Sequence, residues 1–309
     1  MPGPIVVVGS INMDLVVRAP RHPQIGETIL GSDFQTFPGG KGANQAVAAA
    51  RLGGQVKMVG RVGTDSFGDH LLANLEKDGV DTSFVRRTEA TASGVALITV
   101  SEIGQNNIVV VPGANWKLTP EDIQTAEAAF EGAAAVLIQL EIPLDTVEEA
   151  ARMGRKHGAR VLLNPAPAQP LDESLLENVD ILIPNELELS LLTGIQSLLV
   201  AASSLKSIGI DCLIVTLGSK GVLVLDGEEA DHILPHRVSV VDTTAAGDAF
   251  VGAFAVALSE NQTTREAAIW GNAAGALSVT RAGAQPSLPT RKSLEAFITH
   301  HPAVIEKET

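Results

Sequence analysis

The chain has 309 residues, of which 45% are hydrophobic and 19% are charged, so it is long and apolar enough to bury a large core. Its 36 acidic and 22 basic residues give a formal net charge of −14, which argues against a nucleic-acid partner, because phosphate backbones are bound by clustered Lys and Arg. No apolar stretch approaches the length of a membrane span, and no signal peptide precedes the first strand-like run, so we expect a cytoplasmic protein without a membrane partner.

Apolar runs of strand length alternate with helical patterns along most of the chain. The strand-like runs are residues 5–8, 56–59, 135–140, 160–163, 181–183, 212–216 and 221–225. The helical patterns cover residues 43–52, 67–78, 120–130, 144–157, 186–192 and 198–207, and residues 249–281 are mostly helical and rich in Ala. This alternation is typical of βαβ units and predicts an α/β domain whose parallel sheet is covered on both faces.

Two segments depart from the alternation. Residues 13–37 and 91–111 show strand-like alternation without a helical pattern, and residues 101–107 look like a hairpin turn. We expect these segments to form a small separate sheet that acts as a lid beside the main sheet. The predicted organisation is therefore one domain over residues 1–309 with a lid from about 13–37 and 91–111, and with a frayed polar tail at 305–309.

The sequence from Val241 to Phe250 carries the clearest chemical signal. We expect residues 238–241 to form a strand and residues 249–258 a helix, joined by small residues and the carboxylate of Asp248. The first N–H groups of such a helix are unpaired and, together with the helix dipole, attract phosphate. An acid at this place is explained if it accepts a proton from a hydroxyl group while the N–H groups hold the phosphoryl group that the hydroxyl attacks.

Two clusters near the N-terminus offer ligand-binding groups. Residues 38–46 place glycines, Lys41 and Asn44 at a helix start, either to approach a ligand or simply as a Gly-rich turn that caps the helix. Their spacing is not that of a Walker A loop, and no Gly-x-Gly-x-x-Gly fingerprint follows the first strand. Asn12 and Asp14 alternate with apolar residues and share one face, which suits the hydroxyls of a polyol, although an Asx-type turn is the alternative.

Polar groups also follow strands in the second half of the chain. Asn185 and Glu188 have the spacing of a capping box, and the alternative is that Glu188 orients a Mg²⁺ ion through water beside nucleotide phosphates. Residues 215–221 form a turn that either contacts a nucleotide or is a simple hairpin. The single cysteine, Cys212, lies in an apolar run and is expected in the core. His232 and His236 are not a helical metal pair, because Pro235 lies between them.

Taken together, these clusters resemble the PfkB (ribokinase-type) family of carbohydrate kinases along almost the whole chain. The resemblance rests on Gly-Gly-Lys-Gly-Ala-Asn-Gln at residues 39–45 and Asp-Thr-Thr-Ala-Ala-Gly-Asp at residues 242–248, in that order. It implies a Rossmann-like, three-layer α/β domain with a parallel sheet and a small inserted β-sheet lid, and a homodimer that forms through the lid. Asn12-Met13-Asp14 and residues 283–287 resemble the members that act on ribose more than those that act on nucleosides or fructose phosphates.

The resemblance also implies a role for individual residues. Asp248 resembles the catalytic base, and the N–H groups of Ala245, Ala246, Gly247 and Asp248 resemble the anion hole. The sugar-binding positions are Asn12, Met13, Asp14, Gly40, Lys41, Gly42, Ala43, Asn44, Glu141 and Asp248. The nucleotide-binding positions are Asn185, Thr216, Leu217, Gly218, Ser219, Lys220, Gly221, Gly247, Asp248 and Asn272. Glu188 matches the acid associated with Mg²⁺, and a site for an activating K⁺ ion matches Asp242, Thr244, Ser278, Arg281, Gly283 and Ser287, several of them through backbone carbonyls.

The activity implied by the resemblance is transfer of the ATP γ-phosphoryl group to the 5-hydroxyl of D-ribose, with Mg²⁺ and K⁺ as cofactors. One alternative is another kinase of the family, acting on a different pentose, on deoxyribose or on a nucleoside. A nucleoside is expected to need aromatic stacking surface, and aromatic residues make up only 3% of this chain. The other alternative is a non-catalytic sugar or nucleotide sensor, which the presence of Gly247 and Asp248 argues against.

Overall fold

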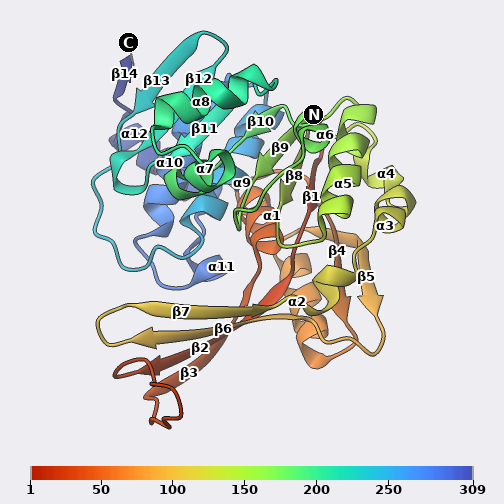
Figure 1. Ribbon diagram of the computed structural model, residues 1–309, viewed down its shortest axis with the longest axis vertical. Helices are drawn as coiled ribbons and strands as arrows, with labels where there is room; N and C mark the ends of the chain where they lie inside the picture. The colour runs from red at the N-terminus through yellow and green to blue at the C-terminus, as the bar shows by residue number, and fades with distance from the viewer. Residues whose placement is uncertain (1, 308–309) are drawn as a thin grey trace.

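The computed structural model describes residues 2–307 and contains a ten-stranded sheet between two layers of helices, with a separate four-stranded sheet at one end (Figure 1). The strands are β1 (Ile5–Val8), β2 (Asn12–Ala19), β3 (Asp33–Gly39), β4 (Val56–Gly63), β5 (Asp81–Thr88), β6 (Gly94–Ser101), β7 (Asn106–Val111), β8 (Ala135–Gln139), β9 (Arg160–Asn164), β10 (Ile181–Leu182), β11 (Cys212–Thr216), β12 (Val222–Asp226), β13 (Glu229–Ile233) and β14 (Ile305–Lys307). The helices are α1 (Lys41–Arg51), α2 (Ser66–Lys77), α3 (Pro120–Thr125), α4 (Glu127–Phe130), α5 (Leu144–Lys156), α6 (Glu173–Leu176), α7 (Glu186–Thr193), α8 (Leu198–Ser207), α9 (Ala246–Ser259), α10 (Thr264–Ser278), α11 (Ala284–Ser287) and α12 (Arg291–His300), with 3₁₀ turns η1 (Gly113–Lys117) and η2 (Gly218–Lys220).

The larger sheet has the strand order β14-β13-β12-β11-β10-β9-β8-β1-β4-β5. All neighbours from β11 to β5 are parallel, so the predicted α/β fold is confirmed. The opposite edge, formed by β12, β13 and β14, is antiparallel, because short hairpins return the chain from β11 to β12 and from β12 to β13.

The frayed tail predicted for residues 305–309 is wrong for Ile305–Lys307, which form β14. This segment pairs with the backbone of β13, which otherwise would be an open edge of the sheet. The ammonium group of Lys307 also lies 2.9 Å from Oδ1 of Asp231, a buried carboxylate of β13. Residues 308 and 309 lie outside the described residues.

The strands of the larger sheet bury side chains on both faces. In β1, Ile5 and Val7 pack in the core cluster that contains α1, α9 and α10, whereas Val6 and Val8 pack in the cluster that contains α5 and α8. Helix α9 is buried along most of its length because its small residues let neighbouring helices approach. A Cβ atom added at Gly252 would lie only 2.5 Å from Cβ of Ala48 in α1. This close packing brings the start of α9 beside α1.

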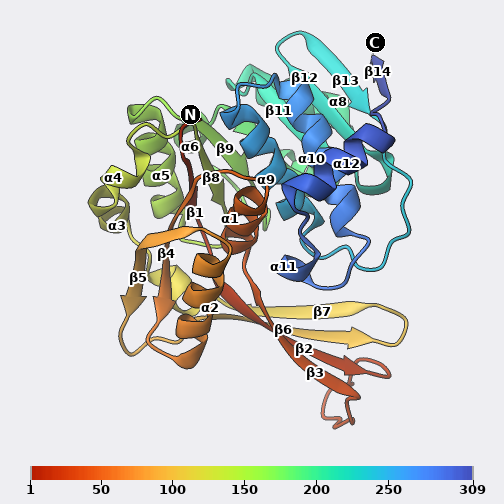
Figure 2. The same ribbon diagram turned by 180° about the vertical axis from the view of Figure 1, so that it is seen from behind.

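The smaller sheet has the strand order β3-β2-β6-β7 and projects away from both helical layers (Figure 2). Strands β2 and β3 are antiparallel, as are β6 and β7, and a parallel β2–β6 pair joins the two halves. The hairpin turn predicted at residues 101–107 is confirmed between β6 and β7, with Gly104 at φ 79°. Because β2 follows β1 closely, this sheet is attached where the parallel strands end.

Two predicted elements differ from the structure. Residues 238–241 are not a strand within the described residues 2–307, and Val240 and Val241 are 63% and 64% exposed. Their apolar character has another cause, because Val238 and Val240 line a large cavity. The helix predicted over residues 120–130 is interrupted at Ala126, which separates α3 from α4.

Smaller expectations can also be compared with the structure. Cys212 is free and buried, as predicted, and burial raises the pKa of its thiol to about 12. His232 lies in β13 and His236 in the loop that follows, so they do not form a helical pair. In the part of the chain from 2 to 307, no single helix is long and apolar enough to cross a membrane, and only the pair α7 and α8, bent by 54°, has the necessary length and composition.

Candidate active site

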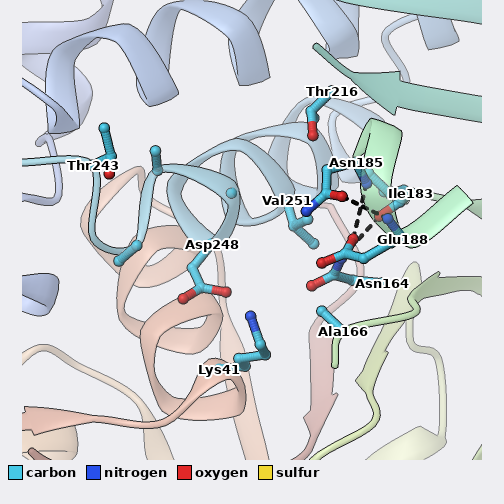
Figure 3. A pocket seen from close by; sticks show the side chains of 13 residues that line it. Lys41, Asn164, Ala166, Ile183, Asn185, Glu188, Thr216, Thr243, Asp248 and Val251 are labelled. Carbon is cyan, nitrogen blue, oxygen red and sulfur yellow. Dashed lines mark hydrogen bonds between the residues drawn. The ribbon is translucent and has the colours of Figure 1, made fainter. Parts of the chain in front are cut away.

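A cavity of about 210 Å³ lies where several parallel strands end, opposite the start of α9 (Figure 3). We call it the narrow cavity. Asn164 at the end of β9 and Thr216 at the end of β11 form part of one wall. The other wall includes residues 245–248 and Lys41, whose side chain extends toward Asp248 (Figure 3).

The start of α9 leaves backbone donors open. Its N-cap residue, Ala245, has φ 60°, a left-handed conformation that is uncommon for a residue with a Cβ atom. The N–H groups of Ala245, Gly247 and Asp248 have no acceptor within residues 2–307, while that of Ala246 lies 3.3 Å from the carbonyl oxygen of Thr243. Open N–H groups at a helix N-terminus form a binding site for an anion. The positive φ is at Ala245 and not at Ala246, so the turn into α9 does not need a glycine at position 246.

The carboxylate of Asp248 is buried and held by two side-chain amides of α1. Its Oδ2 accepts a hydrogen bond of 2.9 Å from Nδ2 of Asn44, and its Oδ1 accepts one of 3.1 Å from Nε2 of Gln45. Since Asp248 belongs to the first turn of α9, the structure places this acid next to the open N–H groups. A proton acceptor and an anion-binding site therefore share one helix start.

A group of charged and polar side chains lies near Asp248, and we call it the buried polar cluster. Its members are Asn12 and Asp14, which are buried, and Lys41 and Glu141, which are half-buried. Asn12 and Asp14 lie two positions apart on β2 and share a face, as predicted, while Met13 between them is packed in the main core. The side chain of Met13 therefore faces away from the cluster.

Hydrogen bonds hold the cluster in place. Oε2 of Glu141 accepts hydrogen bonds from Oγ of Ser10 at 2.5 Å and from the backbone N–H of Lys41 at 3.2 Å. Oδ1 of Asn12 accepts a hydrogen bond of 2.7 Å from Nδ2 of Asn115 in η1. These side chains are thus oriented by the protein itself.

Glycines make room for the cluster. A Cβ atom at Gly39 would lie 2.3 Å from Oδ2 of Asp14, and one at Gly94 would lie 2.1 Å from Oδ1 of Asn12. Gly40 has φ 87°, a backbone conformation that other residues rarely adopt. The Gly-rich segment before α1 therefore forms a turn at Gly40 and lets the carboxylate of Asp14 approach closely at Gly39.

The charges in the cluster influence one another. Burial, with a smaller contribution from the carboxylates of Glu141 and Asp248, raises the pKa of Asp14 to about 7. Burial alone would lower the pKa of Lys41, but the carboxylates of Asp248, Glu141 and Glu188 outweigh it and raise that pKa. The Lys41 ammonium therefore stays charged and offsets part of the negative charge around it.

Glu188 faces the narrow cavity and also caps α7. Oδ1 of Asn185 accepts from the N–H of Glu188 at 2.8 Å, and Oε2 of Glu188 accepts from the N–H of Asn185 at 2.8 Å, so the capping box is confirmed (Figure 3). Burial raises the pKa of Glu188, although the N–H of Asn185 and the charge of Lys41 lower it. Among residues 2–307, no three His, Cys, Asp or Glu side chains are grouped so as to hold a metal ion alone.

A second cavity of about 750 Å³ continues from the narrow one, and we call it the wide cavity. The two cavities share Asn185, Thr216, Thr243, Ala246 and Gly247. The wide cavity is lined by apolar and small residues such as Val222, Val238, Val240, Phe250, Ala276 and Val279. Polar side chains also line it, and one of them, Asn272, donates a hydrogen bond of 2.9 Å from Nδ2 to the carbonyl of Leu234.

The predicted nucleotide-binding turn at residues 215–221 is a hairpin between β11 and β12 that also borders the wide cavity. Gly218, Ser219 and Gly221 line the cavity. Leu217 instead packs against the core beneath α5 and α8, and Nζ of Lys220 lies 2.8 Å from Oε1 of Glu186. The structure therefore does not bring the side chains of Leu217 and Lys220 to the site. The same holds for Ala43, whose side chain is packed in the main core.

Asp242 links the loop before α9 to the segment after α10. Its Oδ1 accepts hydrogen bonds from the N–H of Thr244 at 2.9 Å and from Oγ1 of Thr244 at 2.6 Å, and its Oδ2 accepts one from the N–H of Gly283 at 2.9 Å. Burial acts to raise the pKa of Asp242, but these hydrogen bonds outweigh it and lower the pKa. The carbonyl oxygens of Thr244 and Gly283 accept no backbone hydrogen bond within residues 2–307.

The remaining predicted cation ligands lie in the segment that Asp242 contacts. Ser278 and Ser287 are buried, and their hydroxyls donate to the carbonyls of Gly275 at 2.9 Å and of Ala284 at 2.7 Å. The N–H of Arg281 donates to the carbonyl of Ser278 at 3.1 Å. Within residues 2–307, the oxygen atoms without a hydrogen-bond donor in this region include the backbone carbonyls of Thr244 and Gly283, whereas the two serine hydroxyls are engaged.

Sequence reasoning missed several polar residues of the site. Gln45 contacts Asp248 directly, and Asn164 and Thr243 line the narrow cavity. Gln139 and Asn164 end the adjacent strands β8 and β9 and are register partners. A polar residue at the carboxyl end of an otherwise apolar strand was the available signal, since ligands of α/β folds bind at that edge.

Comparisons with known proteins extend over most of the chain. Residues 4–291 match the pfkB family carbohydrate kinases. The chain belongs to this family. It is 44% identical over 295 residues to the ribokinase of Bacillus subtilis, which covers 96% of this chain and 99% of that one. It is also 40% identical over 301 residues to the deoxyribokinase of Salmonella typhi, covering 96% and 98%.

A solved structure of Arabidopsis thaliana ribokinase complexed with ribose and ATP has the same fold as this carbohydrate kinase. The TM-score is 0.89 at 38% identity, and the match covers 96% of this chain and 99% of that chain. Family membership makes this chain a phosphotransferase, and its α/β domain with an added sheet is the ribokinase-like fold.

Proposed function

We propose that this carbohydrate kinase transfers the γ-phosphoryl group of ATP to the 5-hydroxyl of D-ribose, with Asp248 as the catalytic base. The observation that carries the proposal is a buried carboxylate at a helix start with open N–H groups, between the buried polar cluster and the wide cavity. The names of the Bacillus and Arabidopsis relatives support ribose and ATP as the substrates.

In the proposed reaction, the buried polar cluster binds the hydroxyls of the sugar. Asn12, Asp14 and Glu141 supply acceptors, and Lys41 supplies a charged donor. Asp248 accepts the proton of the 5-hydroxyl as that oxygen attacks the γ-phosphorus atom of ATP. The open N–H groups of α9 bind the oxygens of the phosphoryl group during transfer, and ADP leaves.

ATP is proposed to occupy the wide cavity with its phosphates in the narrow one. The apolar wall formed by Val222, Val240 and Phe250 suits the flat face of a base, and Asn272 supplies polar contact there. The residues shared by both cavities lead from this wall to the open N–H groups of α9. This arrangement would bring a γ-phosphate to Asp248.

We assign Mg²⁺ to Glu188, acting through water. Only Oε2 of Glu188 takes part in the capping box, and Glu188 lines the narrow cavity, so its other carboxylate oxygen remains available to a water of the ion. A bound Mg²⁺ supplies positive charge that neutralises the phosphates in a protein of net charge −14.

We assign an activating K⁺ ion to the region of Asp242, Thr244, Ser278, Arg281, Gly283 and Ser287. The free carbonyl oxygens of Thr244 and Gly283 support this assignment, because K⁺ is a hard cation. A bound cation there would stiffen the loop that leads into the anion-binding site. Initial rates in K⁺, in Na⁺ alone and in a large organic cation test it, and equal rates in all three would contradict it.

The smaller sheet is proposed to act as a lid and as a dimer contact. Asn12 and Asp14 lie on β2 within this sheet, so movement of the sheet would close over the sugar. On its other face, Val17 pairs with Phe34 and Leu97 pairs with Val109, and Phe34 and Val109 are 60% and 61% exposed. Val109→Asp should convert a dimer into monomers in sedimentation velocity. An unchanged sedimentation coefficient would contradict a contact through this face.

The main experiment is an ADP-release assay with D-ribose, 2-deoxy-D-ribose, D-fructose and adenosine as acceptors. D-ribose should give the highest kcat/KM. Phosphorylation of 2-deoxy-D-ribose is the second candidate activity, since a deoxyribokinase is among the relatives at 40% identity. Preference for adenosine or D-fructose would overturn the assignment to pentoses. The cytoplasmic location stays a prediction.

A further inference from the structure

Buried amides form a continuous chain of hydrogen bonds behind Asp248. Nε2 of Gln139 donates to Oε1 of Gln45 at 2.6 Å, and Nε2 of Gln45 donates to Oδ1 of Asp248 at 3.1 Å. Nε2 of Gln45 also donates to Oδ1 of Asn164 at 3.2 Å, while Nδ2 of Asn164 donates to the carbonyl of Ile183 at 2.8 Å. Gln45 and Gln139 are both 0% exposed, so bulk water does not replace these partners.

This series of hydrogen bonds determines which end of the Gln45 amide faces Asp248. A side-chain amide has one donor end and one acceptor end. Because Gln139 occupies Oε1 of Gln45, the NH₂ group of Gln45 must face the carboxylate. Gln139 keeps this orientation although its own Oε1 has no hydrogen-bond donor within residues 2–307. An unpaired buried acceptor is costly, so the donor end of Gln139 contacts Gln45 at the expense of its acceptor end.

The start of α9 competes with these amides for the carboxylate of Asp248. An acid in the first turn of a helix is stabilised by the free N–H groups and commonly folds back onto them. Asp248 is the third residue of α9, yet its oxygens accept from Asn44 and Gln45 and from no backbone N–H within residues 2–307. The N–H groups of Ala245 and Gly247 stay open as a result.

We infer that Gln45, oriented by Gln139, is a positioning residue that holds the Asp248 carboxylate away from the N-terminus of α9. The base and the anion-binding site then remain separate although they belong to the same turn. Asn44 holds the other carboxylate oxygen but is also a predicted sugar contact, so Gln45 is the partner that need not exchange when sugar binds. The inference rests on the proposed function, since it takes Asp248 as the base.

The first test removes the donor of Gln45 while keeping a side chain of similar length. In Gln45→Met, kcat should fall by about 10- to 100-fold, because the carboxylate is misplaced. The KM values for ribose and ATP should stay within about threefold, since neither ligand is expected to contact Gln45. Gln139→Leu, which does not touch Asp248, should lower kcat about tenfold by freeing the Gln45 amide to turn. Gln55→Met, at an exposed glutamine, is the matched control.

The second test uses pH to separate positioning from packing. In Gln45→Glu, the introduced carboxyl group donates a hydrogen bond to Asp248 only when protonated, and when ionised it repels Asp248. The ratio of variant to parent kcat should therefore rise at least about tenfold as the pH falls from about 8 to about 6. A loss of packing alone would leave this ratio constant.

The outcomes separate the inference from the proposed function. Parent-like kcat in Gln45→Met and Gln139→Leu, together with a pH-independent ratio in Gln45→Glu, would overturn the inference and leave the function standing. A parent protein that phosphorylates no sugar would overturn the function itself. Thermal unfolding shows which variants fold, and if Gln45→Met does not, Gln139→Leu and the pH ratio of Gln45→Glu decide.

Discussion

The buried polar cluster and the wide cavity lie on two sides of Asp248 and are built in opposite ways. In the cluster, Glu141 and Asn12 are held by hydrogen bonds from the protein, and Asp14 is kept at a raised pKa by burial. The wide cavity is larger and has a mainly apolar wall, although polar side chains such as Asn272, His236 and Arg237 also line it. The contrast teaches that the hydroxyls of a small sugar need directed polar groups, whereas a nucleotide base is held mainly by shape and apolar contact.

The largest effect is expected where the two sides meet. Asp248→Asn keeps the shape of the side chain but cannot accept the proton, so kcat should fall by about 10³-fold in the ADP-release assay. Binding of ribose and of ATP, measured separately by calorimetry, should change by less than about threefold. Asp211→Asn, at an exposed acid, is the control. Near-normal turnover in Asp248→Asn would remove the acid from the mechanism.

The cluster side is tested by Asp14→Asn. At about pH 8, above the raised pKa of Asp14, loss of this charged acceptor for a sugar hydroxyl should raise the KM for ribose by about 10- to 100-fold. The KM for ATP should stay within about twofold, because the wide cavity lies on the other side of Asp248. Asp33→Asn, at an exposed acid of the same sheet, should leave both values unchanged. Equal increases in both KM values would show that the two sides are not independent.

The cavity side is tested by Asn272→Leu. The variant loses the hydrogen bond from Nδ2 of Asn272 to the carbonyl of Leu234, while the apolar contacts of the wide cavity remain. The KM for ATP should therefore rise only about three- to tenfold, with the KM for ribose unchanged. The matched control is Asn178→Leu, which removes a hydrogen bond of the same kind and length, 2.9 Å, at an exposed site. A 100-fold increase in the KM for ATP would mean that binding in the wide cavity depends on polar contacts as much as binding in the buried polar cluster does.

The smallest effect concerns stability and pH. The folded protein keeps a proton on Asp14 up to about pH 7, while the unfolded chain releases it near the ordinary value of 3.8, so stability falls as pH rises between these values. Asp14→Asn has no such proton. Its Tm, relative to that of the ligand-free parent, should therefore increase by roughly 5 °C between about pH 5 and about pH 8. A pH-independent difference in Tm would place Asp14 in a solvated environment instead.

Much of the fold was predictable because the spacing of apolar residues and the local composition determine where helices and strands form. Apolar runs such as Ile5–Val8 must be buried on both faces, and the helical patterns between them leave a parallel sheet as the solution. The exceptions have physical reasons that are not local. Val238 and Val240 line a cavity instead of a sheet, and Ile305–Lys307 form a strand because β13 offers an open edge.

The sequence alone determined that small residues, a glycine and the acid Asp248 stand together at the start of a helix, where the first N–H groups have no partner within the helix. Only the tertiary structure decided which side chains surround that acid. Gln139 and Asn164 become neighbours through the β8–β9 register, and Gln45 and Asn44 reach Asp248 because α1 packs tightly against α9. The raised pKa of Asp14 is likewise a property of burial among distant carboxylates, which no local pattern encodes.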